Sequence, residues 1–218
     1  MAPNGIVYDH AMGSGSPNLA VFILAGGKST RMGADKAFVM LDGRTLLARA
    51  LELARSLTSD VRIVGDAAKF REFAPVVEDE FRGCGPLGAI HAALRASQAE
   101  LNLMLAVDVP FVSSEFLQFL IERARESKAI VTVAQVKERR QPLCAVYRRE
   151  FADTAENALR AGRYKIDALF ETKTTQMIDE KQLSAAGFSA EMFRNLNTPA
   201  DLEEVRKYLT QDGPHVIG

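Results

Sequence analysis

The sequence predicts an α/β protein: a single three-layer α/β/α domain with a mostly parallel, Rossmann-like sheet and a small antiparallel strand pair. Three observations support this class. Short apolar runs alternate along the chain with amphipathic stretches, which is the pattern of a parallel sheet covered by helices. The run LAVFILA (19–25) is apolar at every position, as expected for a strand buried on both faces. The length of 218 residues, 47% of them apolar, suits one substantial core rather than two.

Six apolar runs are predicted as strands, and the run at 101–107 is the most apolar of them. The last two flank the polar turn KERRQ (137–141) and form the antiparallel pair. In chain order the predicted strands are 19–25, 61–65, 76–79, 101–107, 129–136 and 142–147.

Six further segments are predicted as helices. In the first, leucines and alanines recur at helical spacing, and Pro86 lies in the first turn of the third. Serines and a glutamate open the fourth. In chain order the predicted helices are 44–57, 68–73, 86–97, 113–127, 149–162 and 199–209.

The domain is predicted to span residues 19–209. Residues 1–18 are rich in Gly, Pro, Ser and Asn and are expected to form a flexible arm, and residues 210–218 a flexible tail. The net charge of −1 gives no basic surface for nucleic acid or anionic lipid. No apolar run reaches the length of a membrane span, and no signal peptide pattern is present. Two cysteines without paired spacing suit a reducing compartment, so a cytoplasmic protein is expected.

The stretch after the first strand contains Gly-Lys-Ser (27–29), which is how a Walker A phosphate loop ends. Walker A needs another glycine five positions before the final one. Here that position is Phe22, inside the predicted strand. The loop is therefore not a P-loop for NTP hydrolysis.

The same stretch still has the chemistry of a phosphate site. Gly26 and Gly27 let the backbone approach a ligand closely, and their N–H groups can face phosphate oxygens. Arg31 offers a planar fork for phosphate and Lys36 a point charge. Two fixed cations over one triphosphate suit a reaction that builds negative charge on a pyrophosphate leaving group.

The whole stretch LAGGKSTRMGADK (24–36) resembles the signature loop of the sugar-phosphate and cofactor nucleotidyltransferases, and among them the molybdenum cofactor guanylyltransferases. The signature L-A-G-G-x-S-x-R-M-G-x-D-K is matched at every fixed position. Molybdopterin cytidylyltransferases typically carry Ala-Gly where this chain has Gly26-Gly27, which favours guanine as the base. The resemblance extends from about Leu19 to Leu209.

This resemblance implies transfer of GMP from GTP to the molybdenum–molybdopterin cofactor with release of pyrophosphate. It implies a catalytic set of Arg31, Lys36 and Asp108. The family places its magnesium ligand in a D-x-P motif, which is matched at Asp108-Val109-Pro110. Without this context, a lone Asp after a strand is more commonly a turn or helix cap. Mg²⁺ is the expected cofactor, held by Asp108 with phosphate oxygens and water.

The resemblance also implies a set of GTP contacts. An aspartate just upstream of Gly-Pro-Leu contacts the nucleotide in the family, and Asp79 matches it by order and position. The family often has an asparagine after the second strand, where this chain has Gly65-Asp66, so that contact stays open. The implied GTP-binding residues are Leu24, Ala25, Gly26, Gly27, Lys36, Gly65, Asp79 and Asp108.

On the pterin side, the resemblance implies contacts from Gln141, Asn195 and Asn197. The motif Asn-Leu-Asn-Thr-Pro (195–199) could equally be only a helix cap. The basic cluster within 137–141 lies near a substrate that carries phosphate. A solvated hairpin tip is favoured over a phosphate site for it.

Two other functions compete with the guanylyltransferase. One is a molybdopterin cytidylyltransferase or another sugar-phosphate or cofactor nucleotidyltransferase, and the other a nucleotide-binding regulatory subunit without turnover. Lys36 and Asp108 argue against the latter. The expected partners are GTP and molybdopterin, with transient contacts to cofactor-biosynthesis proteins or molybdoenzyme apoproteins, and neither nucleic acid nor membrane.

Overall fold

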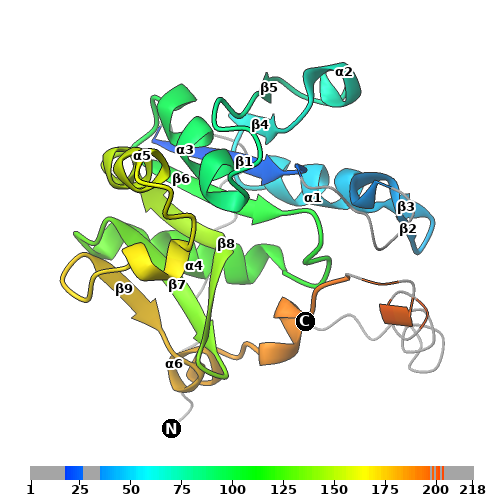
Figure 1. Cartoon of the computed structure of the whole chain (residues 1–218). Helices are drawn as coiled ribbons and strands as arrows, with labels where there is room; N and C mark the ends of the chain where they lie inside the picture. The colour runs from blue at the N-terminus through cyan, green and yellow to red at the C-terminus, as the bar shows by residue number, and fades with distance from the viewer. Residues whose placement is uncertain (1–17, 27–34, 197, 199, 202, 204–218) are drawn as a thin grey trace, which may run out of the picture.

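The computed structural model describes residues 18–26, 35–196, 198, 200, 201 and 203 (Figure 1). The predicted tail and nearly all of the predicted arm lie outside these residues. So does most of the predicted helix 199–209, although residues 200, 201 and 203 are helical. No described helix is both long and apolar enough to cross a membrane.

Within the described residues, seven strands form one sheet in the order β5-β4-β1-β6-β8-β7-β9. β1 pairs in parallel with both β4 and β6, whereas β8 runs antiparallel to its neighbours β6 and β7. The prediction of a mostly parallel sheet with an antiparallel pair is confirmed. The strands are β1 Leu19–Leu24, β4 Val61–Val64, β5 Val76–Val77, β6 Leu101–Ala106, β7 Val131–Val136, β8 Arg139–Arg148 and β9 Thr175–Ile178.

The strand order reverses between β1 and β6. From β1 the chain moves outward through β4 and β5, and then returns to place β6 on the other side of β1. In open α/β sheets, ligands bind outside the carboxyl ends of the strands at such a reversal. The fold therefore singles out the loops that follow β1 and β6.

Helices cover both faces of the sheet, which confirms the three-layer prediction (Figure 1). Alternate residues of β1 serve the two faces: Val21 and Ile23 pack with α1 and α4, whereas Ala20 and Phe22 pack with α3 and α5. The helices are α1 Leu46–Arg55, α2 Ala67–Phe70, α3 Pro86–Ala96, α4 Ser114–Glu126, α5 Phe151–Arg160 and α6 Glu180–Ala185, with 3₁₀ turns η1 Lys36–Phe38, η2 Ile166–Leu169 and η3 Ala190–Phe193.

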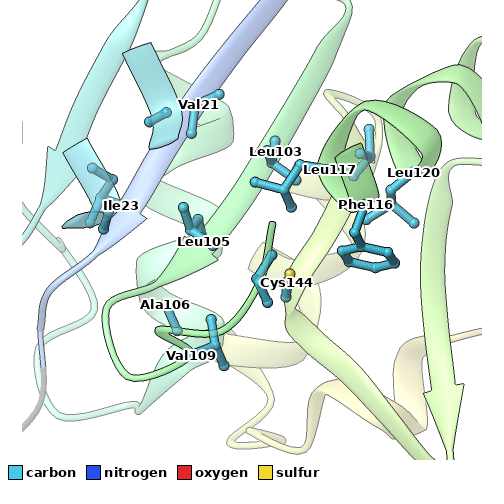
Figure 2. Packing of buried hydrophobic residues seen from close by; sticks show 14 of the residues in the cluster. Val21, Ile23, Leu103, Leu105, Ala106, Val109, Phe116, Leu117, Leu120 and Cys144 are labelled. Atoms are coloured by element: carbon cyan, nitrogen blue, oxygen red, sulfur yellow. The ribbon is translucent and has the colours of Figure 1, made fainter. Parts of the chain in front are cut away.

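Figure 2 shows the core on the α1 and α4 side, where leucines of β6 meet Phe116, Leu117 and Leu120 of α4. Cys144 of β8 is buried in this cluster, and burial raises the pKa of its thiol to about 12. The thiol therefore stays protonated at neutral pH and is a packing group rather than a nucleophile. The core extends to Val109, so the loop after β6 packs against buried side chains.

The predicted polar turn 137–141 is shorter in the structure. Arg139 pairs with Val136 and Arg140 with Gln135, so β8 begins at Arg139 and the turn is only Lys137-Glu138. Charged side chains are tolerated at this end of the strand because Arg139 is exposed. The charge run was therefore misread as loop.

Three short elements were not predicted from the sequence: β9, α6 and a hairpin of β2 Met40–Leu41 with β3 Arg44–Thr45. Each is too short to show a clear hydrophobic period. The hairpin turns through Asp42-Gly43, both with positive φ, and Asp-Gly is a favoured pair for such a turn. It takes two residues from the predicted helix 44–57, and α1 starts at Leu46 with the Thr45 side chain as its cap.

Candidate active site

The described candidate residues gather at the carboxyl edge of the sheet. They follow β1, β4, β5 and β6, and Gln141 lies near the start of the antiparallel β8, which begins at the same edge. The N–H of Val107 donates to the carbonyl of Leu24 (3.4 Å), which joins the loops after β6 and β1 at the strand reversal.

The two strongest catalytic candidates touch. The Nζ atom of Lys36 lies 2.9 Å from Oδ2 of Asp108, and each side chain is 21% exposed. Asp108 is the second residue after β6, and Lys36 starts η1, whose next residue, Ala37, is completely buried. Motifs 72 residues apart are thus brought together by the fold, with the pair open to a ligand.

The signature aspartate, Asp35, has a structural role that sequence reasoning missed. Its Oδ1 accepts from the N–H of Ala37 (3.2 Å) and caps η1, which holds Lys36 in place. Its Oδ2 pairs with Lys69 (2.9 Å), and this contact raises the pKa of Lys69. The spacing of an Asp just before a short turn was the signal that could have revealed the cap.

On the nucleotide side, the side chains of Leu24 and Ala25 are buried, so any contact with a ligand would use their backbone. Gly26 is exposed, and an added Cβ there would meet nothing among the described residues closer than the carbonyl of Val64 at 3.9 Å. Packing against the described residues does not demand a glycine at this position, and the space beside its Cα is open to close approach of a ligand. Gly27 and Arg31 lie outside the described residues.

The position after β4 differs from the family's usual asparagine for a steric reason. A Cβ at Gly65 would lie 2.9 Å from the ring of Phe70, which occupies the space of a side chain. The N–H of Gly65 donates to Val77 (3.0 Å), so a backbone contact with a ligand would come from its carbonyl. The carboxylate of Asp66 caps α2 by accepting from Ala68 (2.9 Å). One carboxylate oxygen of Asp66 is thus engaged in the cap, and which of the two residues takes the asparagine's place stays a prediction.

Asp79 lies against the first turn of α3. Its Oδ1 accepts from the N–H of Phe81 (2.8 Å), and an added Cβ on Gly88 would lie 2.5 Å from its Oδ2. Burial raises the pKa of Asp79, although the Phe81 N–H and the nearby His91 and Arg82 act in the opposite direction. The absence of a Cβ on Gly88 thus leaves room for this carboxylate in its observed position.

The segment before the last helix is anchored beside Asp108. The N–H of Leu196 donates to the backbone carbonyl of Asp108 (3.0 Å), and its side chain is completely buried with Leu41 and Leu46. Asn195, next to this anchor, is exposed, and Asn197 lies outside the described residues.

Thr198 and Asp201 cap each other reciprocally. The N–H of Thr198 donates to Asp201 (2.8 Å), and the N–H of Asp201 to the hydroxyl of Thr198 (3.1 Å). Thr198 therefore acts as a helix cap, as one interpretation of this motif predicted. The contacts of Asn195 and Asn197 with the pterin stay predictions.

Beyond Asp108, a groove runs between the β7–β8 hairpin and η3, and Gln141 lines it. We call it the β8 groove. Its lining residues are Val136, Lys137, Arg139, Gln141, Ala190, Glu191, Phe193 and Arg194. Arg140 does not line this groove. Its Nη1 donates to the carbonyl of Asp167 (2.8 Å), and its guanidinium lies over Phe170. The predicted cluster of three cations is split between two surfaces.

Asp108 suits Mg²⁺ bound together with a nucleotide. Mg²⁺ is usually held by one or two carboxylates, with substrate phosphates and water completing its shell. No group of three His, Cys, Asp or Glu side chains among the described residues could form a metal site by itself. The single partly exposed carboxylate of Asp108 therefore fits an ion that arrives with phosphates.

Comparison with known proteins gives a consistent result. The family profile described as "MobA-like NTP transferase domain" matches residues 21–177. A probable molybdenum cofactor guanylyltransferase of Carboxydothermus hydrogenoformans is 33% identical over 191 residues, which is 87% of this chain and 96% of that protein. A molybdenum cofactor guanylyltransferase of Desulfosudis oleivorans is 36% identical over 185 residues, 84% of this chain and 91% of that protein.

Among solved structures, the molybdopterin-guanine dinucleotide biosynthesis protein A from Archaeoglobus fulgidus superposes with a TM-score of 0.77 at 27% identity. The match covers 88% of this chain and 98% of that one. From the family profile, the relatives and the paired Lys36 and Asp108 at the strand reversal, it follows that this chain belongs to the MobA-like NTP transferase family and is a nucleotidyltransferase.

Proposed function

We propose that the protein transfers GMP from GTP to the terminal phosphate of the molybdenum–molybdopterin cofactor, forming the guanine dinucleotide cofactor and releasing pyrophosphate. The observation that carries the proposal is the contact of Lys36 with Asp108 at the strand reversal, 2.9 Å from Nζ to Oδ2. It unites the end of the glycine-rich signature with the D-x-P motif at the one edge where such sheets bind ligands.

The choice of GTP is supported by the relatives, several of which are named molybdenum cofactor guanylyltransferase. The Gly26-Gly27 pair of the signature points the same way. A molybdopterin cytidylyltransferase, or another cofactor or sugar-phosphate nucleotidyltransferase, is the alternative.

The reaction needs alignment and charge neutralisation more than proton transfer. An oxygen of the acceptor's terminal phosphate forms a bond to the α-phosphorus of GTP. The bond from that phosphorus to the bridging oxygen of the β-phosphate breaks, and the electron pair leaves on pyrophosphate. The attacking phosphate is already anionic at neutral pH, so no general base is required.

We assign to Lys36 the stabilisation of the leaving pyrophosphate. Its ammonium touches the carboxylate that would hold Mg²⁺, so phosphates gathered at Asp108 would also lie within reach of Lys36. When bound, Mg²⁺ supplies positive charge that offsets the charge of the triphosphate. Arg31 is assigned the same task by the family signature, from outside the described residues.

The remaining nucleotide contacts would come from the β1, β4 and β5 side. Gly26 would allow close approach of the phosphates. The carbonyl of Gly65 and the carboxylate of Asp79 would accept hydrogen bonds from the nucleoside. A carboxylate accepts hydrogen bonds from N–H or O–H donors, such as those of a guanine edge or a ribose. Gln141 and Asn195 would face the acceptor.

The test is a panel of GTP, CTP, UTP and ATP with Mg²⁺ and molybdenum-loaded molybdopterin, in which pyrophosphate release and the dinucleotide product are both measured. We expect turnover with GTP to exceed that with each other nucleotide at least tenfold. Preferred use of CTP would establish the cytidylyltransferase instead. Nucleotide binding without pyrophosphate release would show a regulatory protein.

A further inference from the structure

The β8 groove has a cavity volume of about 560 Å³ and opens at the same sheet edge as Asp108. One wall is the start of β8: its ladder with β6 ends at Leu105 and Cys144, three residues before Asp108 and three after Gln141. The other wall is η3 and Arg194, which leads through Leu196 to the carbonyl of Asp108. The start of β8 and the segment after η3 therefore both lie close in the fold to the loop that carries Asp108.

The groove lies on the far side of Asp108 from the nucleotide contacts. In the sheet order, β5, β4 and β1 stand to one side of β6, and β8 and β7 to the other. A transfer reaction needs two substrates that meet from opposite sides of the α-phosphorus, because the attacking and leaving oxygens are in line. The groove occupies the side that GTP would leave open.

The lining of the groove is basic although the whole chain has a net charge of −1. Lys137, Arg139 and Arg194 contribute three cations, and Glu191 contributes one carboxylate. The buried Val136 and Phe193 give it an apolar floor. An anionic ligand with a flat apolar part matches this lining.

The turn that contains Lys137 has a backbone conformation that is sterically unfavourable for its two residues. Lys137 (φ 47°) and Glu138 (φ 61°) both have left-handed backbone, as a two-residue hairpin of this kind requires. The β2–β3 hairpin meets the same demand with Asp42-Gly43, a pair suited to it. Lys and Glu occupy a turn that Asn-Gly or Asp-Gly would adopt more easily, and backbone strain of this kind is often found where a side chain is used.

β8 is also irregular next to this turn. Its register with β7 shifts between Val133 and Gln135, and Pro142, which has no N–H to donate, lies in the shifted part. Such a bulge bends a strand and re-aims its side chains. Successive side chains of a strand point to opposite faces, so Arg139 and Gln141 line the groove whereas Arg140 reaches Asp167 on another surface.

We propose that the β8 groove is the acceptor subsite, and that Lys137, Arg139 and Arg194 bind a pterin phosphomonoester through its anionic groups. This inference rests on the proposed function and gives the basic hairpin a binding role, where the sequence favoured a solvated tip. Arg194 lies two residues before Leu196, whose N–H donates to Asp108, so it would bind the part of the ligand closest to the reacting phosphate. Lys137 and Arg139 would bind the part of the ligand farther from that phosphate.

The experiment compares a Lys137→Ala/Arg139→Ala double variant with Arg140→Ala, the matched control from the same hairpin. Both altered residues of the double variant are exposed, so the fold should persist. Dissociation constants are measured for metal-free molybdopterin under anaerobic conditions and, separately, for GTP with Mg²⁺. We expect at least tenfold weaker molybdopterin binding in the double variant, unchanged GTP binding, and wild-type values for Arg140→Ala.

Unchanged molybdopterin affinity in the double variant would overturn the inference, as would no molybdopterin binding by the wild-type protein. An equal loss in Arg140→Ala would also do so, because it would indicate a general charge effect. Failure of the proposed function looks different: wild-type protein would bind molybdopterin with the expected dependence on Lys137 and Arg139, yet form no guanine dinucleotide from GTP.

Discussion

The two sides of the carboxyl edge are built in different ways. On the proposed nucleotide side, the signature is one continuous stretch of sequence (24–36). Its glycines, and those near it, matter because they lack a Cβ: the space beside Gly26 is unfilled by the described residues, and Gly88 makes room for Asp79. On the proposed acceptor side, the β8 groove is assembled from the β7–β8 hairpin and the segment around η3, more than 45 residues apart. Its cations contribute through long side chains.

This difference explains what each side can tolerate. On the proposed nucleotide side, a Cβ added at Gly88 or Gly65 would lie within 3 Å of the side chain of Asp79 or Phe70, so that side chain would have to shift. A site made of exposed cations loses contacts one at a time. Lys36 and Asp108 lie between the two sides and belong to both.

The largest effect should come from this shared pair. We expect Lys36→Ala or Asp108→Asn to reduce kcat for GMP transfer by about 10³-fold, because each removes charge that acts on the developing pyrophosphate. Steady-state assays with saturating GTP and molybdopterin measure kcat. The matched control is Lys69→Ala, which breaks an ion pair of the same 2.9 Å length on the surface.

Lys69→Ala should keep kcat within about twofold, since exposed ion pairs contribute little. The comparison breaks down if Lys36→Ala retains most of its turnover, or if Lys69→Ala falls as far as Lys36→Ala.

The next effect is confined to the nucleotide side. Gly88→Ala places a Cβ 2.5 Å from Oδ2 of Asp79, so the carboxylate must move. We expect GTP affinity to fall about tenfold, which is about 1.4 kcal/mol, with molybdopterin affinity unchanged. Helix stability should not suffer, since alanine is the better helix former. Calorimetry of both ligands measures the separation.

A double-mutant cycle sharpens this prediction. In an Asp79→Ala background, Gly88→Ala should have no further effect on GTP affinity, because the carboxylate it displaces is gone. Additive losses would mean that Gly88 acts through something other than Asp79.

A smaller effect concerns stability and pH. Burial raises the pKa of Asp79 in the folded protein, so folding favours its protonated form. This carboxyl therefore stabilises the fold below its ordinary pKa, and that contribution is lost as the pH rises through the folded-state pKa. Asp79→Asn should stabilise the protein at pH 7 by about 1 kcal/mol or less, since solvent screens a partly exposed group.

Urea unfolding at several pH values measures this. The gain from Asp79→Asn should fade as the pH falls into the range where Asp79 is protonated, while GTP binding at pH 7 is weakened. A gain that persists unchanged into acid would contradict the pKa explanation.

Much of the fold could be predicted because long apolar runs and periodic helices leave little choice of packing. β1 and β6 were recognisable since every residue in them is buried. β9 and α6 were missed because their signal is local and weak: β9 has one buried residue, Ile178, and α6 has Leu183. Tertiary contacts, rather than sequence period, determine such elements.

The site divides in the same way. Asp108 and Lys36 were predicted from motif order, and the structure places them in contact. Asp35 as a cap and Gly88 as the space beside Asp79 were missed, because their roles depend on neighbours distant in space rather than on residue type. The β8 groove was missed because the hairpin register decides which arginine faces it.

The smallest effect separates the two roles of the acceptor-side turn. Glycine adopts left-handed backbone without the steric cost that Lys137 and Glu138 bear, although it loses more backbone entropy on folding. Lys137→Gly and Glu138→Gly should therefore each stabilise the protein, by roughly 0.5 kcal/mol as the net of these terms. Only Lys137→Gly should weaken molybdopterin binding, because Glu138 does not line the groove. Thermal unfolding and molybdopterin titration of the two variants give four values. A purely structural turn would show two stabilised proteins with unchanged affinity, and the cation at position 137 would then have no part in recognising the acceptor.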